Sequence, residues 1–498
     1  MPSDMLKLRQ LEGLINPSEF CRDEMNLWPL YRFYISESFR NDRLGASLLD
    51  RKTGSFLDQL KMILKGIPGI FSVLMSAKKA DAVFLSNSNF QRFTLDGAKF
   101  DPYCYPVVTE LNSRRMQSVV YQVGQPVTAQ RDFIKTVNIE YAINSWYFVL
   151  APMATVLERL RLLFSDKTCL SLKVNIALDS LGIDLKIPDD SFFIERAARL
   201  RIKALFFRLL LQKHAPSYGL MVGYGSGSGL AFTYACSVEN IKSIELQHGM
   251  VSSGLARYAD WTNVPIKGYE LLPDTFWCWH KSDMIDVYSW VENSSSHNVI
   301  PGGNLYLRFR QDFLSAEAEQ LKKKLQLSRK SYNHLCLVAL QSKMVEPLWL
   351  MDAITTCDST TFWIFKFHPA DQHKDERAKL IEQCFSGRGL NNYDLINANH
   401  AALNIYDCIE EVDSVVSSFS SSLLEAMMLW KIPVIIHPEG IVHYQKYIDS
   451  GSMLLKSNRR DFVDYFNMTR KSDLAISGRS DSENIKKIID QIFTPKAE

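Results

Sequence analysis

The sequence has no excess of charge of either sign, and this absence excludes several classes of protein. Lys and Arg number 57 and Asp and Glu number 55 in 498 residues, so the formal net charge is only +2. A dedicated nucleic-acid binder usually carries a strongly basic excess, so we expect no nucleic-acid partner. The 46% share of hydrophobic residues also excludes a disordered chain. Any anion site must therefore be built locally, from a few placed donors.

Paired cysteines and long hydrophobic runs are missing as well. The 9 cysteines, from Cys21 to Cys408, stand singly, with no CxxC pair and no metal-ligand spacing. Such a set indicates reduced thiols in a cytoplasmic protein. The first residues lack the apolar region of a signal peptide. The longest uncharged stretch, residues 215–238, is interrupted by glycines and serines, so we expect no membrane span.

Several motifs of well-known sites do not occur. No GxGxxG motif follows a strand, and there is neither a phosphate-binding GK[ST] loop nor a GxSxG nucleophile motif. No DxD motif stands at the end of an expected strand, so a metal-bridged diphosphate site is not indicated. We therefore expect no cofactor and no metal requirement.

Two segments, residues 61–75 and 199–211, mix basic and apolar residues at helical spacing. Helices that lie on a membrane surface have this pattern, and so do ordinary helices that pack one face on a core. Both interpretations stay open, so peripheral association with the inner face of the plasma membrane is one expectation.

The chain does show a regular alternation of short apolar strands and helical segments. Residues 1–80 are mostly helix-like, without hairpin signals, and helices are also expected at about 106–111, 191–213 and 316–325. The expected strands are residues 82–86, 118–123, 218–224, 241–246, 275–279, 335–340, 362–367, 393–396, 414–416 and 433–436. Strands that alternate with helices predict parallel sheets.

We therefore predict an α/β protein with two Rossmann-like parallel-sheet domains facing a cleft, and with extra N-terminal helices. The first domain is expected at residues 1–300 and the second, with a terminal helix, at residues 301–498. Ligands of open parallel sheets bind at the carboxyl ends of the strands. Polar side chains that follow the expected strands are thus the candidate site residues.

The segment Phe365–Pro369, FKFHP, ends one expected strand. Strand alternation places Lys366 and His368 on one face and the two phenylalanines on the other. Pro369 stops the strand. A lysine and a histidine that converge at a strand end suit a phosphoryl group, although an exposed strand end without a ligand is the alternative.

The segment 415–436 predicts a strand, a serine-rich turn, a helix and a second strand. Ser420, Ser421 and Ser422 stand at the expected helix start, where free N–H groups favour an anion. Glu425 follows one turn later and would suit a ribose diol. The plainer alternative is that one serine only caps the helix and that Glu425 lies at the surface.

Two further segments follow strands in the first half. Gln247 and His248 come directly after the strand at 241–246, and a histidine there could act as a base or bind phosphate. The loop after the first strand carries Arg92, Asp96 and Asp101, which are candidate acceptor-binding or base residues. A solvated polar loop explains this second set equally well.

Four motifs together resemble a known family: LQHG (Leu246–Gly249), the segment Pro273–Trp279, FKFHP (Phe365–Pro369) and SSFSSSLLEA (Ser417–Ala426). Their order and spacing are similar to those of bacterial GT-B glycosyltransferases that make surface polysaccharides such as capsule and lipopolysaccharide. The resemblance covers about residues 80–460. An HP motif followed by a serine motif is typical of enzymes that use CMP-activated acidic sugars, such as sialyl- and Kdo-transferases, and similar motifs occur in CDP-glycerol polymerases.

The resemblance implies a GT-B glycosyltransferase with a nucleotide-sugar donor and a glycan or lipid-linked acceptor. His368 would contact the donor phosphate, with Lys366, Pro369, Ser422 and Glu425 around it, and Ser420 and Ser421 would hold phosphate or ribose. On the acceptor side, His248, Asp96 or Asp101 would be the base, and Arg92 and Gln247 would bind the acceptor. Two alternatives remain: a sugar-nucleotide epimerase or hydrolase of the same fold, and a non-catalytic assembly protein of a polysaccharide complex.

Overall fold

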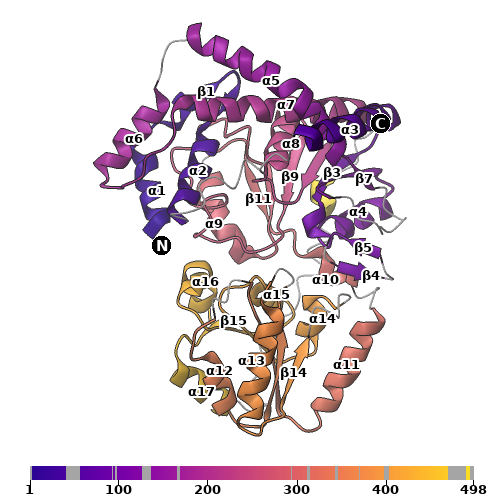
Figure 1. Cartoon of the computed structure of the whole chain (residues 1–498), viewed down its shortest axis with the longest axis vertical. Coiled ribbons are helices and arrows are strands. Elements are labelled where there is room, and N and C mark those ends of the chain that lie inside the picture. Colours follow the sequence, from indigo (N-terminus) through magenta and orange to yellow (C-terminus); the bar gives the residue numbers. More distant parts are fainter. Residues whose placement is uncertain are drawn as a thin grey trace. The chain divides into compact units, whose positions relative to one another are not determined.

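The computed structural model describes residues 3–40, 56–91, 93–95, 98–125, 136–164, 169–292, 294–310, 315–342, 346–368, 371–396, 403–468 and 489–493. The chain divides into two compact units. Unit 1 consists of residues 1–92, 99–306 and 485–498, and unit 2 of residues 93–98 and 307–484. Each unit contains its own parallel sheet, and Figure 1 labels many of the elements.

The sheet of unit 1 has seven described strands in the order β11-β10-β9-β8-β3-β6-β7. Every neighbouring pair runs parallel. The bounds are β3 Ala82–Asn87, β6 Ser118–Val123, β7 Thr136–Asn138, β8 Tyr218–Met221, β9 Lys242–Leu246, β10 Thr275–Trp277 and β11 Asn298–Ile300. The chain winds outward from β3 to one side and from β8 to the other, so the strand order reverses between β3 and β8.

Helices occupy most of the remainder of unit 1. Their bounds are α1 Ser3–Leu14, α2 Trp28–Arg40, α3 Phe56–Ser76, α4 Cys104–Ser113, α5 Glu140–Phe164, α6 Leu170–Ser180, α7 Asp190–His214, α8 Gly227–Val238 and α9 Lys281–Val291, with short 3₁₀ helices at Pro17–Phe20 and Ser88–Phe90. Helix α10, Leu305–Phe309, begins in unit 1 and ends in unit 2. The helices predicted at 106–111 and 191–213 are confirmed as α4 and α7. Each extends one or two residues further at both ends.

The N-terminal region also contains a small hairpin, which the sequence analysis did not foresee. Strands β1 (Cys21–Arg22) and β2 (Met25–Asn26) pair antiparallel. Asp23 and Glu24 connect them with φ angles of 46° and 63°. A two-residue turn of this hand fits the twist of a hairpin, but it usually contains glycine or asparagine, so the signal was hidden.

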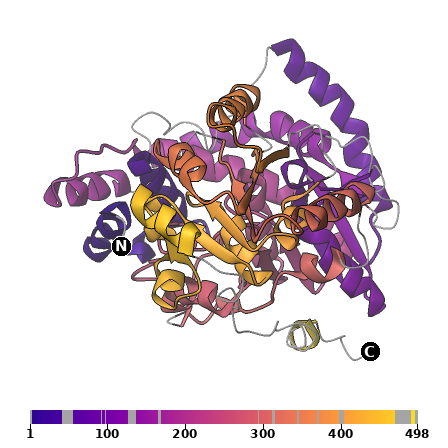
Figure 2. The same cartoon turned by 90° about the horizontal axis from the view of Figure 1, so that it is seen from below.

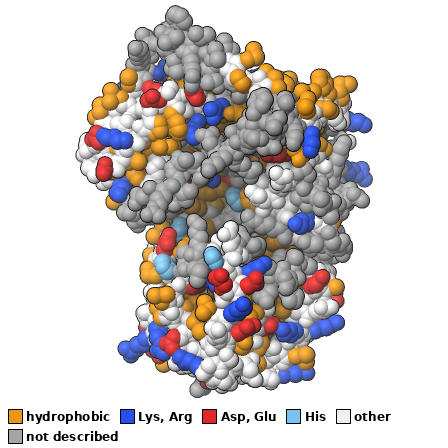
Figure 3. Space-filling view, viewed as in Figure 1, with side chains coloured by type: hydrophobic (Ala, Val, Ile, Leu, Met, Phe, Trp, Pro, Cys, Tyr) orange, Lys and Arg blue, Asp and Glu red, His pale blue; other side chains and the backbone are white. Residues whose placement is uncertain are grey.

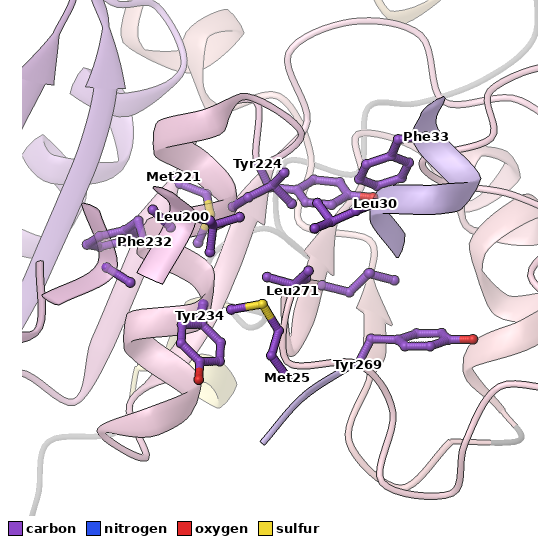
Figure 4. Packing of buried hydrophobic residues seen from close by; sticks show 14 of the residues in the cluster. Met25, Leu30, Phe33, Leu200, Met221, Tyr224, Phe232, Tyr234, Tyr269 and Leu271 are labelled. Carbon is purple, nitrogen blue, oxygen red and sulfur yellow. The ribbon is translucent and has the colours of Figure 1, made fainter. Parts of the chain in front are cut away.

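The core of unit 1 joins the N-terminal helices to the sheet. Figure 4 shows side chains from this core, among them Leu30 of α2, Leu200 of α7, Met221 of β8 and Phe232 of α8. All four are buried, so the N-terminal helices belong to the hydrophobic core of unit 1. Packing of this extent, and not intrinsic helix propensity, supplies most of the stability of such helices.

The sheet of unit 2 has six described strands in the order β14-β13-β12-β15-β16-β17, again all parallel. The bounds are β12 His334–Ala339, β13 Thr361–Lys366, β14 Tyr393–Ile396, β15 Ser414–Ser417, β16 Ile432–Ile435 and β17 Leu454–Leu455. In both views the strands lie side by side (Figures 1 and 2). Here the strand order reverses between β12 and β15.

Helices cover this second sheet: α11 Ala316–Ser328, α12 Leu350–Thr356, α13 Lys374–Ser386, α14 Ile405–Glu410, α15 Ser422–Met428, α16 Glu439–Asp449 and α17 Arg459–Met468. A two-stranded sheet of β4 (Phe93–Leu95) and β5 (Ala98–Phe100) comes from the segment after β3. Strand β4 belongs to unit 2. There the ring of Phe93 packs against that of Tyr406 in α14, with ring centroids 5.9 Å apart.

The predicted fold class is confirmed: the chain is α/β, with two parallel sheets that both have the Rossmann strand order, a GT-B-like fold. The cleft expected between the domains stays a prediction. The sequence analysis assigned the terminal helix to the second domain. Its described residues, 489–493, instead pack on unit 1, where Tyr218 donates a hydrogen bond to the Ile492 carbonyl at 2.7 Å and its ring contacts Phe493. Within the described part of the chain, no helix is long and apolar enough to cross a membrane.

Candidate functional site

The point at which the strand order of unit 2 reverses lies between the ends of β12 and β15. The Ser417 hydroxyl donates to the Ala339 carbonyl at 2.8 Å and ties the two strand ends together. Directly after Ser417, the serine turn (Ser418–Ser422) leads into α15. Because ligands of doubly wound sheets bind beside such a reversal, the serine turn occupies the expected ligand position of this sheet.

Helix α16 supports the serine turn from behind. The Tyr444 hydroxyl donates to the Ser420 carbonyl at 2.8 Å, and Gly440 lies so close that a Cβ there would be 2.7 Å from the Ser418 carbonyl oxygen. A side chain larger than hydrogen at Gly440 would therefore push α16 away from the turn. The backbone of the turn is thus fixed by groups that the sequence analysis did not single out.

The three predicted serines lie together, and each has a different environment. The Ser420 hydroxyl accepts a hydrogen bond from the Ser422 amide at 3.2 Å. Ser421 precedes α15, and its hydroxyl caps no amide of the helix. The Ser422 hydroxyl is buried and has no hydrogen-bond partner among the described residues. The plainer alternative, in which one serine serves as an ordinary cap, therefore does not account for Ser421 and Ser422.

Glu425 lies in α15 and is buried, so the alternative of a surface glutamate is wrong. The Tyr406 hydroxyl donates to its carboxylate at 3.3 Å. Burial raises the pKa of Glu425 to about 7, and the Tyr406 hydrogen bond opposes that rise. Near neutral pH, the Glu425 carboxyl group is therefore neutral in some molecules and charged in others. Its contact with a ribose stays a prediction.

Lys366 and His368 stand at the end of β13, as the strand alternation predicted. Phe365 and Phe367 are buried in the core of unit 2, whereas Lys366 and His368 are partly exposed. The Lys366 ammonium donates to the Leu403 carbonyl at 3.1 Å. His368 begins a turn in which its carbonyl accepts from the Asp371 amide at 2.9 Å. Pro369 lies outside the described residues.

The two motifs of unit 2 meet through the segment 403–406, which contacts Lys366 at one end and Glu425 at the other. The fold thus brings together Lys366, the serine turn and Glu425 around the ends of β13, β12 and β15. These residues come from stretches about fifty positions apart in the sequence, and only the sheet order places them at one edge.

Arg377 of α13 is a positioning residue that the sequence analysis missed. Its guanidinium donates to the Gln341 carbonyl at 2.6 Å, pairs with Asp371 at 2.7 Å and pairs with Glu346 at 2.8 Å. These partners lie in the loops that follow β12 and β13. A single buried arginine therefore fixes both loops beside the serine turn.

His437 and His443 were also missed, although the sequence offered a signal for one of them. His437 lies two residues after the end of β16 and is followed by Pro438, which repeats the histidine–proline pattern of His368. The ring of Phe419, in the serine turn, contacts both histidines, with centroids 5.9 and 6.1 Å apart. The ends of β13, β15 and β16 thus all carry groups that can interact with an anion.

In unit 1, Gln247 and His248 lie at the end of β9. Gln247 is buried and its amide is occupied: it donates to the Gly249 carbonyl and to Asp283, and it accepts from the Trp279 amide at 2.5 Å. Its contacts are those of a residue that shapes the loop, and a role in acceptor binding stays a prediction.

The His248 ring is enclosed by aromatic rings and stays partly exposed. Its centroid lies 4.9 Å from that of Phe90 and 6.2 Å from that of Tyr103, and Tyr103 in turn stacks on Trp279. Phe90 also packs on Gly223, which has a φ of 75° and begins the glycine-rich loop before α8. His248 thus lies beside the point at which the strand order of the first sheet reverses, between β3 and β8.

Glu245 of β9 lies behind His248 and was not among the predicted residues. One of its carboxylate oxygens is 3.9 Å from His248 Nδ1 and accepts a hydrogen bond from the Tyr258 hydroxyl at 2.8 Å. Burial raises the pKa of Glu245 to about 8, although the Tyr258 hydrogen bond and the nearby Arg257 oppose the rise. A buried carboxyl group thus lies near the imidazole, at a distance longer than a hydrogen bond.

The remaining predicted residues lie in the loop after β3. Asp101 is fully buried and accepts hydrogen bonds from the Ser86 hydroxyl at 2.6 Å and from the amides of Tyr103 and Cys104. Burial raises the pKa of Asp101. These contacts fix the start of α4 and the position of Tyr103, so they describe a positioning role, and a role as base stays a prediction. Arg92 and Asp96 lie outside the described residues.

No metal centre is formed by the described residues: nowhere among them do three His, Cys, Asp or Glu side chains group in a way that could hold an ion. The described cysteines are all free thiols, and most of them are buried. Among the candidate site residues described beside the strand ends of unit 2, hydroxyls, histidines and a lysine outnumber the one carboxyl group, that of Glu425.

Known structures resemble this fold, although no protein-family model and no curated protein matches the chain. A UDP-GlcNAc 2-epimerase from Neisseria meningitidis bound to UDP-GlcNAc is 13% identical, with 82% of this chain and 98% of that chain covered and a TM-score of 0.49. MnaA from S. aureus with UDP is 11% identical over 83% and 96%, with a TM-score of 0.45. HepE from Anabaena with UDP and glucose is 12% identical over 82% and 95%, with a TM-score of 0.40. At these identities the likeness concerns the fold alone.

Proposed function

We propose that the protein is a glycosyltransferase that moves a sugar from a nucleotide-activated donor to a glycan or lipid-linked acceptor in surface polysaccharide biosynthesis. The observation that carries this proposal is the position of the serine turn, at the reversal of strand order in unit 2 and beside Lys366. A CMP-linked acidic sugar is the favoured donor, because the HP and serine motifs resemble those of enzymes that use such donors. The reaction would take place on the cytoplasmic side.

In the proposed transfer, an acceptor hydroxyl attacks the anomeric carbon of the donor sugar. The bond between that carbon and the phosphate oxygen breaks, and the electron pair leaves with the nucleotide. Lys366 and His368, both partly exposed at the end of β13, would stabilise the charge that develops on the phosphate. The hydroxyls of Ser421 and Ser422 would donate hydrogen bonds to phosphate or ribose oxygens.

The proton of the acceptor hydroxyl requires a base, and His248 is the base that the contacts of unit 1 favour. It is partly exposed, its ring is held by Phe90, and Glu245 lies 3.9 Å from its Nδ1. Asp101 is less suited, since three hydrogen bonds already occupy its buried carboxylate. His248→Ala should lower kcat by about a hundredfold or more while donor affinity stays unchanged.

Binding of free nucleotides by calorimetry tests the donor site. The panel contains CMP, UDP, GDP and CDP, and we expect CMP to bind most tightly. Ser421→Ala and His368→Ala should each weaken that binding by roughly tenfold, the equivalent of one charge-assisted hydrogen bond. Ser386→Ala, which changes an exposed serine at the end of α13, is the matched control and should bind as the native protein does.

Three results would contradict the proposal. Full nucleotide affinity in both Ser421→Ala and His368→Ala would show that the donor site lies elsewhere. Conversion of a nucleotide-sugar to its epimer, or its hydrolysis, at full rate without any acceptor would favour the epimerase or hydrolase alternative. Absence of binding to any nucleotide would favour a non-catalytic assembly protein.

Metal removal gives an independent prediction. Because Lys366 and His368 supply positive charge at the strand end, we expect transfer to proceed without a divalent ion. Incubation with EDTA followed by gel filtration should leave the transfer rate unchanged, and added Mg²⁺ or Mn²⁺ should not increase it. A rate that falls with EDTA and returns with one of these ions would show that the charge is neutralised by a metal instead.

A further inference from the structure

Helix α3 has a second apolar face, which is directed away from the core. Leu64, Pro68, Phe71 and Met75 are spaced four, three and four residues apart, so they form one stripe along the helix. Their side chains are exposed: 63% for Leu64, 67% for Phe71 and 81% for Met75. The opposite face contains Ile70 and Val73, which are buried. A core-packing helix needs only the inner stripe, so the outer one requires another explanation.

Helix α5 extends this apolar surface. Gly66 of α3 lies against Ser145 and the Tyr141 carbonyl of α5, and the small residues let the two helices pack closely. In α5, Val149 and Met153 are exposed to 50% and 64%. Figure 3 shows hydrophobic side chains gathered in the upper right of the view, where Figure 1 places α3. The exposed apolar side chains of these two packed helices are here called the α3–α5 surface.

Positive charge borders this surface, and negative charge does not occur along α3 beyond its first turn. Residues 59–80 contain Lys61, Lys65, Lys78 and Lys79 and no Asp or Glu. Lys65, Lys78 and Lys79 are exposed, and the Lys65 ammonium lies 6.0 Å from the ring centroid of Tyr141. By contrast, α13 in unit 2 exposes Asp375, Glu376 and Glu382 on its outer face, as an ordinary solvated helix does.

We propose that the α3–α5 surface docks onto an anionic lipid bilayer. Apolar side chains at helical spacing with lysines beside them are the composition of helices that lie in the plane of a membrane interface. The lysines would contact anionic headgroups while Leu64, Phe71 and Met75 enter the acyl boundary. A second copy of the chain is a poorer occupant, because a two-fold interface would place the same lysines near one another.

The second segment with a basic, apolar pattern does not share these properties. In α7, the apolar residues Leu200, Ile202, Phe206, Phe207, Leu210 and Leu211 are buried in the core of unit 1. Helix α7 therefore buries most of the apolar residues of its segment and exposes only Leu205 to 40%, whereas α3 buries one apolar face and exposes a second. This difference could not be read from the sequence, in which both segments look alike.

Co-sedimentation of the full chain with vesicles tests the proposal. One set of vesicles contains only phosphatidylcholine, and the other contains equal amounts of phosphatidylcholine and phosphatidylglycerol. We expect binding to the anionic vesicles that weakens as salt is added. The double variant Phe71→Ser with Met75→Ser should bind at least about tenfold more weakly, and Lys78→Gln with Lys79→Gln should lose the preference for the anionic lipid.

The matched control is Leu172→Ser with Ile176→Ser, which removes two similarly exposed apolar side chains from α6. This variant should bind vesicles as the native chain does, and thermal unfolding verifies that all variants are folded. No binding by the native chain, or equal loss in the control, would overturn the proposal. So would a dimer in sedimentation velocity that Phe71→Ser with Met75→Ser dissociates. The inference rests on the exposed side chains of α3 and α5 and not on the proposed transferase activity. Nucleotide binding, measured without vesicles, can therefore fail or succeed independently of vesicle binding.

Discussion

At the scale of single residues, two buried glutamates have unusual protonation. Glu245 and Glu425 come from different units, yet both lie within one turn or one strand of a predicted site residue. Burial raises the pKa of Glu245 to about 8 and that of Glu425 to about 7. Shifts of this size in carboxyl groups beside strand ends are more frequent at functional sites than elsewhere. The sequence shows two ordinary glutamates, since desolvation depends on packing.

The pKa of Glu245 makes a prediction about stability. In the unfolded chain the group loses its proton near pH 4.5, whereas in the folded chain it keeps it to about pH 8. The folded state therefore binds more protons between these values, and the contribution of Glu245 to stability, present at low pH, is lost as the pH rises to about 8. The full loss is on the order of 4–5 kcal/mol.

Glu245→Gln removes this titration while it keeps the shape of the side chain. Relative to the native chain, the variant should gain free energy of unfolding progressively from pH 5 to pH 8, and the difference should level off above that range. Urea unfolding at several pH values measures the effect. A difference between native chain and variant that does not change with pH would show that Glu245 is already charged at pH 5.

At the scale of secondary-structure elements, side chains from neighbouring helices hold the loops at the carboxyl ends of the strands in unit 2. Arg377 of α13 joins the loops after β12 and β13, and Tyr444 and Gly440 of α16 support the serine turn. Neither helix contributes a predicted ligand-binding side chain. The positions of Lys366, His368 and the serines nevertheless depend on them.

Loss of the hydrogen bonds and ion pairs of Arg377 should destabilise unit 2. Arg377→Ala leaves the carboxylate of Asp371, which is fully buried, without its cation, and we expect a loss of about 3–5 kcal/mol. Arg460→Ala is the control, because the pair of Arg460 with Asp464 is exposed and should contribute below about 1 kcal/mol. Denaturant unfolding compares the two, and equal losses would contradict the role of the buried ion pair.

A methyl group at Gly440 should disturb the serine turn. The Cβ of an alanine there would be 2.4 Å from Ile435 Cγ2 and 2.7 Å from the Ser418 carbonyl oxygen, so α16 must shift. We expect Gly440→Ala to cost about 1–3 kcal/mol and to weaken nucleotide binding as well. Gly13→Ala in α1, where no atom lies within 4 Å of the new Cβ, should cost no stability and leave nucleotide affinity unchanged. Unchanged nucleotide affinity in Gly440→Ala would separate the turn from the donor site.

At the scale of the whole chain, the N-terminal helices are an integral part of unit 1. Glu12 of α1 and Arg32 of α2 form a fully buried ion pair at 2.6 Å. Arg32 also donates to the carbonyls of Ala256 and Ala259 and stacks on Trp261, with 4.1 Å between the guanidinium carbon and the ring centroid. The first forty residues thus hold the segment that follows the QHG motif, and through it the surroundings of His248.

Removal of Arg32 alone should therefore lower the free energy of unfolding strongly. Arg32→Met leaves a buried, unpaired carboxylate at Glu12, with an expected loss of about 3–5 kcal/mol. The double variant Glu12→Leu with Arg32→Met removes both charges and should recover a large part of this loss. Thermal and urea unfolding of the native chain, the single variant and the double variant measure these differences in stability. A double variant that is no more stable than the single one would show that the hydrogen bonds to residues 256–262, and not the charge pair, dominate.

The sequence alone determined most of the secondary structure and the fold class. Strands such as Ser118–Val123 and Tyr393–Ile396 were predicted to the residue, because a short apolar run between turn residues is a local signal. The order of residues along the chain also predicted that His368 and the serines of the serine turn follow strands. The shorter strands β7, β11 and β17 were missed, since two or three residues contain too little pattern.

Only the tertiary structure decided the order of the strands and the environment of the site residues. The reversals at β3–β8 and β12–β15 join strands that are more than seventy residues apart, and no local pattern encodes such pairs. Burial of Glu245, Glu425 and Asp101, and exposure of Phe71 and Met75, likewise depend on what packs against each side chain. The net charge of +2 follows from the composition, whereas the grouping of cationic and polar side chains at neighbouring strand ends follows from the fold. Local propensity therefore fixes the elements, and non-local packing and desolvation decide which of their side chains can perform chemistry.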